Sequence, residues 1–201
     1  MKTIYKGLFS FFLFSISSIL VAQEKNSFFD SRHRVGFLVG YGTQNFGQLS
    51  LEVPYDYEIT FFKAQYYYVL KKGQEISLEL LAQPQFNLTQ YRHIDFFSDK
   101  SNGFEVGLNI GALIRKNLNS SQMSIYAAIT SGPHFVSGTP QRQVEGFVFS
   151  SNFMVGVNFR LNNHTFLDIR PSFRHISNLD FKKPNGGVNN LVLSGGVLVN
   201  L

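Results

Sequence analysis

The chain has 201 residues, no cysteine and no tryptophan, and 18 Lys and Arg residues against 13 Asp and Glu residues. Its length fits one domain, the lack of cysteine excludes a disulfide framework, and the mild positive charge does not favour nucleic-acid binding. Aromatic residues are abundant, with 22 Phe and 9 Tyr. Mean hydropathy is nevertheless −0.03, because Gly, Ser, Asn and Gln separate the apolar residues.

The N-terminal segment 1–22 predicts a secretory signal peptide. Lys2 and Lys6 precede an apolar run that ends at the small residue Ala22. A membrane-anchoring helix is the alternative, but the run is short for one and is interrupted by serines. Cleavage after Ala22 would leave residues 23–201 as a single domain with 16 basic residues against 13 acidic ones, a net charge of +3.

The rest of the chain alternates apolar residues with small or polar ones, a period of two that is typical of β-strands. In segment 102–117 the even positions from Phe104 to Ile114 are apolar, whereas the odd positions carry mostly Gly, Glu, Asn and Arg. Segment 144–161 has the same pattern, with its apolar residues on odd positions. Weaker alternation predicts six more strands, at 34–42, 57–72, 74–93, 121–138, 165–178 and 189–201. Pro84 predicts a bulge or a strand end within the third of these.

Eight strands joined by alternating short and long connections predict an eight-stranded antiparallel transmembrane β-barrel of the outer membrane. The short turns contain KKGQ, NLNSSQ and RLNNHT, and the longer loops span 43–56, 92–102, 136–143 and 179–188. A soluble β-sandwich or lipocalin-like barrel would bury the apolar face instead. Glycines opposite that face favour the membrane barrel, because side chains crowd the interior of a small barrel. A filled interior is no solute channel, so function is expected on the wall, the rim or the loops.

Strand 165–178 contains the candidate site. One of its faces carries Asp168, Arg170, Ser172 and Arg174. The opposite face carries Leu167, Ile169, Pro171 and Phe173, followed by His175 and Ser177. We expect the charged face inside the barrel, where Asp168 can pair with Arg170 or with charged groups on neighbouring strands, and the apolar face toward lipid. His175 and Ser177 would then point outward near one membrane interface.

The next strand, 189–201, starts with Asn189 on its own outward apolar face. Because the two strands are antiparallel neighbours, His175, Ser177 and Asn189 are expected to cluster outside the barrel. Ser beside His is the nucleophile–base arrangement of acyl transfer, in which a third polar group orients the base. The substrate on such a wall would be a lipid ester. The spacing H-x-S is a weak signal alone, so the alternative is a His and Ser that only hydrogen-bond lipid headgroups.

The stretches FRHISN at 173–178 and KPNGGVN at 183–189 resemble the C-terminal signature of the outer-membrane lipid A 3-O-deacylase (PagL-type) family, also known as acyloxyacyl hydrolases. The resemblance implies that Ser177 is the nucleophile, His175 the general base and Asn178 part of the oxyanion hole. It also implies hydrolysis of the ester-linked acyl chain at position 3 of lipid A, within lipopolysaccharide, without a metal or an organic cofactor.

The family's third triad member is a glutamate about a dozen residues after the serine, whereas this chain has Asn189 there. An amide can hold the imidazole but cannot stabilise the imidazolium, and in serine proteases such a replacement lowers the rate by about 10⁴. Asp180 could substitute only if its loop folds back. A second hypothesis is therefore a catalytically inactive barrel with a lipid-binding or structural role. A third hypothesis is a surface receptor built on the loops, which are of modest length. The strand pattern is also compatible with a homodimer.

Overall fold

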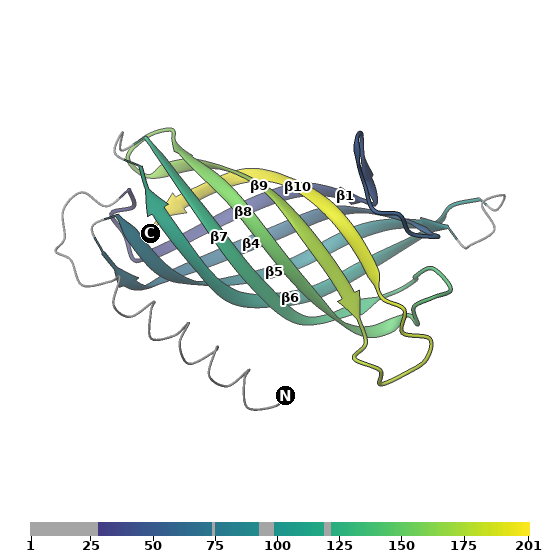
Figure 1. Ribbon diagram of the computed structural model, residues 1–201. Helices are drawn as coiled ribbons and strands as arrows, with labels where there is room; N and C mark the ends of the chain where they lie inside the picture. The colour runs from purple at the N-terminus through teal and green to yellow at the C-terminus, as the bar shows by residue number, and fades with distance from the viewer. Residues whose placement is uncertain (1–27, 74, 93–98, 119–121) are drawn as a thin grey trace, which may run out of the picture.

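The computed structural model describes residues 28–73, 75–92, 99–118 and 122–201. In these ranges eight long strands close into one antiparallel barrel in the order β1-β10-β9-β8-β7-β6-β5-β4 (Figure 1). They are β1 (His33–Thr43), β4 (Asp56–Lys72), β5 (Ile76–Arg92), β6 (Ser101–Asn117), β7 (Met123–Val136), β8 (Gly146–Arg160), β9 (Thr165–Ser177) and β10 (Val188–Asn200). The predicted eight-stranded antiparallel β-barrel is thereby confirmed.

The expected signal peptide, 1–22, lies outside the described residues. Among the described residues, no helix has the length and apolar character needed to cross a membrane.

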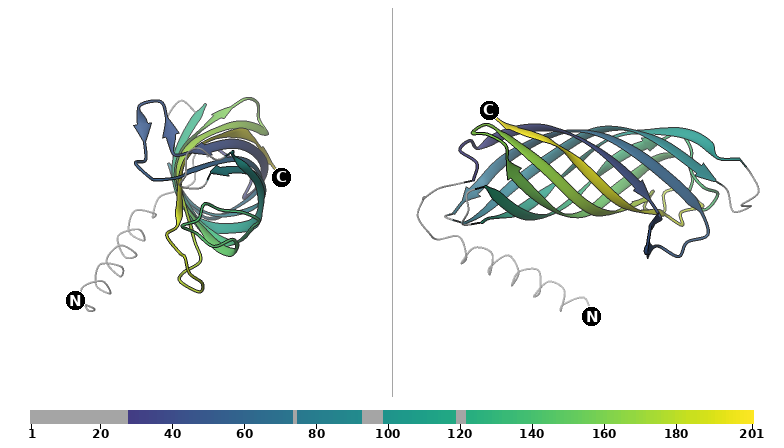
Figure 2. Two further views of the ribbon diagram at one scale, coloured as in Figure 1. Left: turned by 90° about the vertical axis from the view of Figure 1, so that its right-hand side faces the viewer. Right: turned by 90° about the horizontal axis from the view of Figure 1, so that it is seen from above.

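The β1–β4 connection holds an extra hairpin, made of β2 (Asn45–Phe46) and β3 (Leu49–Ser50). The view along the barrel axis in Figure 2 shows the hairpin outside the ring of strands. It projects from the same end of the barrel as the β9–β10 loop (Figure 1). The expected long loop 43–56 therefore contains β-structure that lies outside the ring of strands.

The strands alternate as predicted, with apolar side chains outward. In β6, Phe104 and Ile110 are 41% and 56% exposed, whereas Glu105 and Arg115 are buried. A soluble barrel would reverse these two faces. An apolar outer wall of this extent fits a lipid surround, since soluble monomers rarely expose such large apolar patches.

Charged side chains lie in the interior among two clusters of buried apolar residues, and they pair with one another. Asp168 and Arg170 form the expected ion pair, at 2.6 Å. Glu79 pairs with Arg115 at 2.9 Å, and Glu105 pairs with Arg174 at 2.7 Å. Buried ions persist only when partners replace the lost hydration, and each of these pairs has further hydrogen bonds. The interior thus combines paired charges with apolar clusters, and together they fix the strands that carry the candidate site.

Candidate active site

The outer face of β9 carries both predicted residues. His175 and Ser177 are partly exposed, and they alternate with Arg174 and Ile176, which are fully buried. This parity follows from the inner face, because the Arg174 guanidinium bonds to Glu105 inside the barrel. The interior contacts therefore set the direction of the two outward side chains.

His175 is hydrogen-bonded to Asn189. The two residues are direct partners in the β9–β10 ladder, and the His175 Nδ1 atom lies 2.6 Å from the Asn189 Oδ1 atom. An amide oxygen only accepts hydrogen bonds, so this contact places the proton of the neutral ring on Nδ1 and leaves the lone pair on Nε2. That is the tautomer in which Nε2 can act as a base.

Ser177 lies two residues further along the strand, beside its ladder partner Phe149. Two positions of a strand are separated by roughly 7 Å along the chain, so its side chain shares the face of His175 one step nearer the rim. Within the described residues, the Ser177 hydroxyl forms no side-chain hydrogen bond. The structure thus joins His175 to Asn189 and leaves Ser177 nearby but unengaged.

Asn178 starts the loop that follows β9, and its side chain is only 2% exposed. Its Nδ2 atom donates to the Lys182 carbonyl at 2.6 Å, and its main-chain N–H donates to Asn185 Oδ1 at 2.8 Å. The residue after it, Leu179, has a φ of 54°. The side-chain amide of Asn178 therefore ties the β9–β10 loop together, and its donor faces a loop carbonyl in this state.

Asp180 does not reach His175. Its Oδ1 atom accepts hydrogen bonds from Lys183 at 2.7 Å and Asn185 at 2.9 Å, on the exposed side of the loop. These two donors hold the pKa of the Asp180 carboxyl below its usual value. The loop does not fold back, and the neutral Asn189 is the partner of the imidazole.

Gly187 covers the ring of His175. A Cβ atom built on Gly187 would lie 2.5 Å from Cε1 and 3.2 Å from Nε2 of His175, and the Gly187 φ is 66°. Only glycine combines this left-handed conformation with so close an approach. The main chain at Gly187 therefore limits the positions open to the imidazole.

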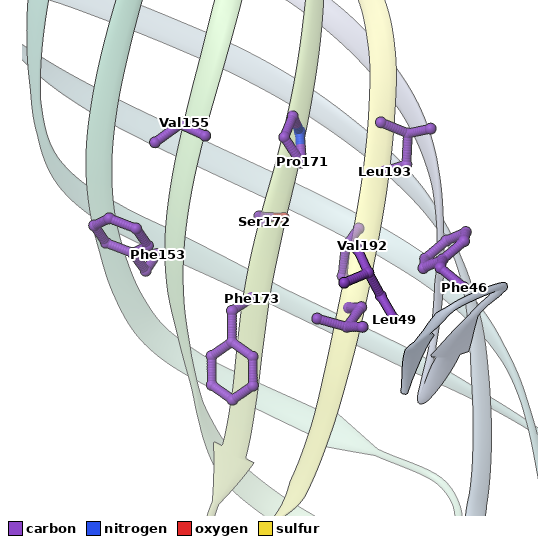
Figure 3. Close-up of a pocket in the computed structure, with 10 residues that line it drawn as sticks. Phe46, Leu49, Phe153, Val155, Pro171, Ser172, Phe173, Val192 and Leu193 are labelled. Atoms are coloured by element: carbon purple, nitrogen blue, oxygen red, sulfur yellow. The ribbon is translucent and has the colours of Figure 1, made fainter. Parts of the chain in front are cut away.

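An apolar groove of about 420 Å³ lies on the outer wall of the barrel (Figure 3). Its walls come from β8, β9, β10 and the β2–β3 hairpin, and they include Phe46, Leu49, Phe153, Pro171, Phe173 and Leu193. Phe173 lies two residues before His175 on the same face of β9. The groove thus approaches the His175–Asn189 pair from the apolar part of the wall.

Several residues near the site were not found from the sequence. Ser151 is the ladder partner of His175 on β8, and its hydroxyl lies 3.0 Å from that of Ser131. Asn189 itself is held by Gln44 and Tyr55, from the far end of the chain. The outward parity of Ser151 was a usable signal, but nothing local marks Gln44 or Tyr55. In the described ranges, no group of three or more His, Cys, Asp or Glu residues could hold a metal ion.

Comparisons with known proteins indicate the fold and the family of this chain. The model of the lipid A 3-O-deacylase (PagL) family matches residues 60–197. The crystal structure of Neisserial surface protein A (NspA) aligns with a TM-score of 0.53 at 12% identity, over 85% of this chain and 98% of that one. The crystal structure of the outer membrane enzyme PagL aligns with a TM-score of 0.52 at 14% identity, over 84% of this chain and 99% of that one.

At such identities the two structures support the fold alone, which is the eight-stranded barrel of outer-membrane proteins. No curated protein sequence matches the chain. The family model, in contrast, spans β4 to β10 and includes the segment with His175, Ser177 and Asn189. Since it covers more than half of the chain, the chain belongs to the lipid A 3-O-deacylase (PagL) family.

Proposed function

We propose that this barrel is an esterase that hydrolyses the ester-linked acyl chain at position 3 of lipid A. The observation that carries the proposal is the 2.6 Å contact between His175 Nδ1 and Asn189 Oδ1. It leaves Nε2 as a base on a lipid-facing wall, two residues from Ser177. Membership of the lipid A 3-O-deacylase family supports the choice of substrate.

In the proposed reaction, His175 Nε2 takes the proton of Ser177 Oγ while Oγ attacks the carbonyl carbon of the ester. The C–O bond to the sugar then breaks, and the imidazolium gives its proton to the departing sugar oxygen. Water attacks the resulting acyl-enzyme in the same manner. The acyl chain leaves as a fatty acid, and Ser177 regains its proton.

Two amides support these steps, Asn189 at the imidazole and Asn178 at the oxyanion. Asn189 keeps the imidazole oriented but adds no negative charge beside the imidazolium, so a slow reaction is expected. Asn178 stabilises the oxyanion in this proposal. The Nδ2 group carries two N–H donors and only one is engaged, with the Lys182 carbonyl, so this role requires the second N–H to face the developing oxyanion.

The apolar groove is the proposed place of the acyl chain. It lies on the wall where lipid tails are in contact, and its lining is almost wholly apolar side chains. A chain in the groove would end near His175 and bring its ester to Ser177. Lipid tails are as apolar as this lining, so the groove would select an acyl chain by shape and van der Waals packing and not by removing it from water.

The proposal includes a location. Residues 1–22 would direct export and be removed, and residues 23–201 would form the barrel in the outer membrane of a Gram-negative bacterium. The rim with the long loops faces the cell exterior in such barrels. The site, near that rim, would meet lipid A in the outer leaflet.

A catalytically inactive, lipid-binding barrel is the second candidate. It is favoured by the neutral Asn189 in place of a carboxylate and by the unengaged Ser177 hydroxyl. Mass spectrometry of lipid A from cells with and without the protein separates the two candidates. The esterase predicts loss of one acyl chain that requires Ser177, because Ser177→Ala removes the nucleophile. An unchanged lipid A spectrum alongside folded protein would reject it.

A further inference from the structure

A side chain closes the gap between β4 and β10 beside Asn189, a gap called the seam below. The β1 ladder ends at the pairs Thr43–Leu191 and Gly42–Ile59. Beyond them β4 and β10 continue with no strand between them. The side chain of Gln44, which is 7% exposed, lies in this gap.

Gln44 bonds to both flanking strands, as a peptide group would. Its Oε1 atom accepts the Tyr57 main-chain N–H at 2.8 Å. Its Nε2 atom donates to the Tyr57 carbonyl at 3.0 Å and to the Asn189 carbonyl at 2.9 Å. The Asn189 main-chain N–H donates to the hydroxyl of Tyr55 at 2.8 Å, and Tyr55 is buried. Both main-chain polar groups of Asn189 are therefore held from the seam side.

This arrangement fixes how Asn189 meets His175. The N–H and C=O of one strand residue point to the same neighbour in an antiparallel ladder, so those of Asn189 point away from β9. The Asn189–His175 pair is then a non-hydrogen-bonded pair, the kind whose side chains lie closest. A neutral amide holds an imidazole with about half the strength of a carboxylate. Rigid placement of the Asn189 main chain compensates for that weaker bond.

We propose that Gln44 and Tyr55 are positioning residues that act through Asn189 to keep His175 in its Nδ1–H tautomer, a role that rests on the proposed function for its effect on rate. Both residues lie outside the region 60–197 matched by the family model. Their contribution thus belongs to this chain's own β1–β4 connection, next to the hairpin that lines the groove.

The first test reads the tautomer without any reaction. Long-range ¹⁵N–¹H spectra of the full-length protein in detergent micelles resolve the two nitrogens of each ring, and His175→Gln assigns the signal among five histidines. Gln44→Met and Tyr55→Phe should convert a fixed Nδ1–H pattern into a tautomer mixture, and Asn189→Ala should do the same. Gln85→Met and Tyr126→Phe, which remove matched buried groups elsewhere in the barrel, should leave it unchanged.

The second test is kinetic coupling. Each of Gln44→Met and Tyr55→Phe should slow release of fatty acid from purified lipid A by roughly 10- to 100-fold. The same changes should cost nothing further in an Asn189→Ala background. Tyr55→Phe loses a single oxygen, so an unaltered His175 spectrum in the folded variant overturns the proposal. An equal fold-decrease in rate in the wild-type and Asn189→Ala backgrounds also overturns it. If the variants change the His175 tautomer but the wild-type protein does not hydrolyse lipid A, the esterase is rejected and the positioning role is supported.

Discussion

The two faces of β9 differ in how completely their polar groups are satisfied. On the inner face, the Arg174 guanidinium reaches Ser150, Glu105 and Asn190, and Arg170 reaches Asp168, Tyr67 and Gln65. On the outer face, His175 has one side-chain partner and the Ser177 hydroxyl none among the described residues. Stability is concentrated inside, and groups free to react are left outside.

The first prediction separates the two faces directly. Ser177→Ala should lower hydrolysis by roughly 10³-fold or more, because the nucleophile is lost, while the unfolding temperature stays unchanged. Arg174→Ala should instead lower the stability of the barrel, by about 3–5 kcal/mol, because the buried Glu105 carboxylate loses its guanidinium partner. Heat-modifiable gel migration measures unfolding, and fatty-acid release measures activity. Equal loss of stability in both variants would contradict the division between the faces.

The second prediction strengthens the outer face. Asn189→Glu supplies the carboxylate that stabilises the imidazolium, so hydrolysis should rise, by up to about 10⁴-fold if the charge is the limiting deficit. Asn189→Gln is the matched control, with the same length and no charge. A rate that stays the same in Asn189→Glu, with His175 still on Nδ1–H, would show that the missing charge does not limit this barrel.

The third prediction concerns the backbone that covers His175. Gly187→Ala places a methyl group 2.5 Å from Cε1 of His175 and should displace the ring, lowering hydrolysis by roughly 10- to 100-fold. Gly47→Ala is the control, because Gly47 has a φ of 60° but no atom within 4 Å of the added Cβ. The two variants share the backbone strain and differ in the contact. Comparable losses of activity would assign the effect to strain instead.

The sequence predicts the faces better than the partners. Strand parity places His175 outward, and the proximity of β9 and β10 along the chain predicts its contact with Asn189. Gln44 could not be predicted, because its role depends on where β1 stops beside strands that are distant in sequence. The bulge or strand end predicted at Pro84 is wrong, because the prediction did not consider which neighbouring strand its missing N–H faces. The strand β5 runs through it with no register shift, pairing Pro84 with Leu108 on β6, so its missing N–H faces the other neighbour.

Asn178 illustrates a different limit. Resemblance to the family predicts a role at the oxyanion, but it cannot show which acceptor the amide uses before substrate binds. The structure shows a loop carbonyl in that place. Side-chain hydrogen bonds in loops depend on the exact path of the main chain, which strand periodicity does not describe.

The smallest expected effect tests the groove on the outer face. Phe46→Ala removes a ring that the β2–β3 hairpin contributes to the groove, so van der Waals contacts with a long acyl chain are lost and the KM for long-chain esters should rise by roughly three- to tenfold with little change in kcat. Phe86→Ala is the control, since Phe86 is a similarly outward ring on β5, 47% exposed and absent from the groove lining. The ratio of KM values for long and short acyl chains is the decisive measurement.

A groove that binds the substrate chain predicts a change in that ratio for Phe46→Ala alone, because a short chain makes less contact with the hairpin. The same ratio in both variants would mean that ordinary membrane lipid fills the groove and that chain selection lies elsewhere on the wall.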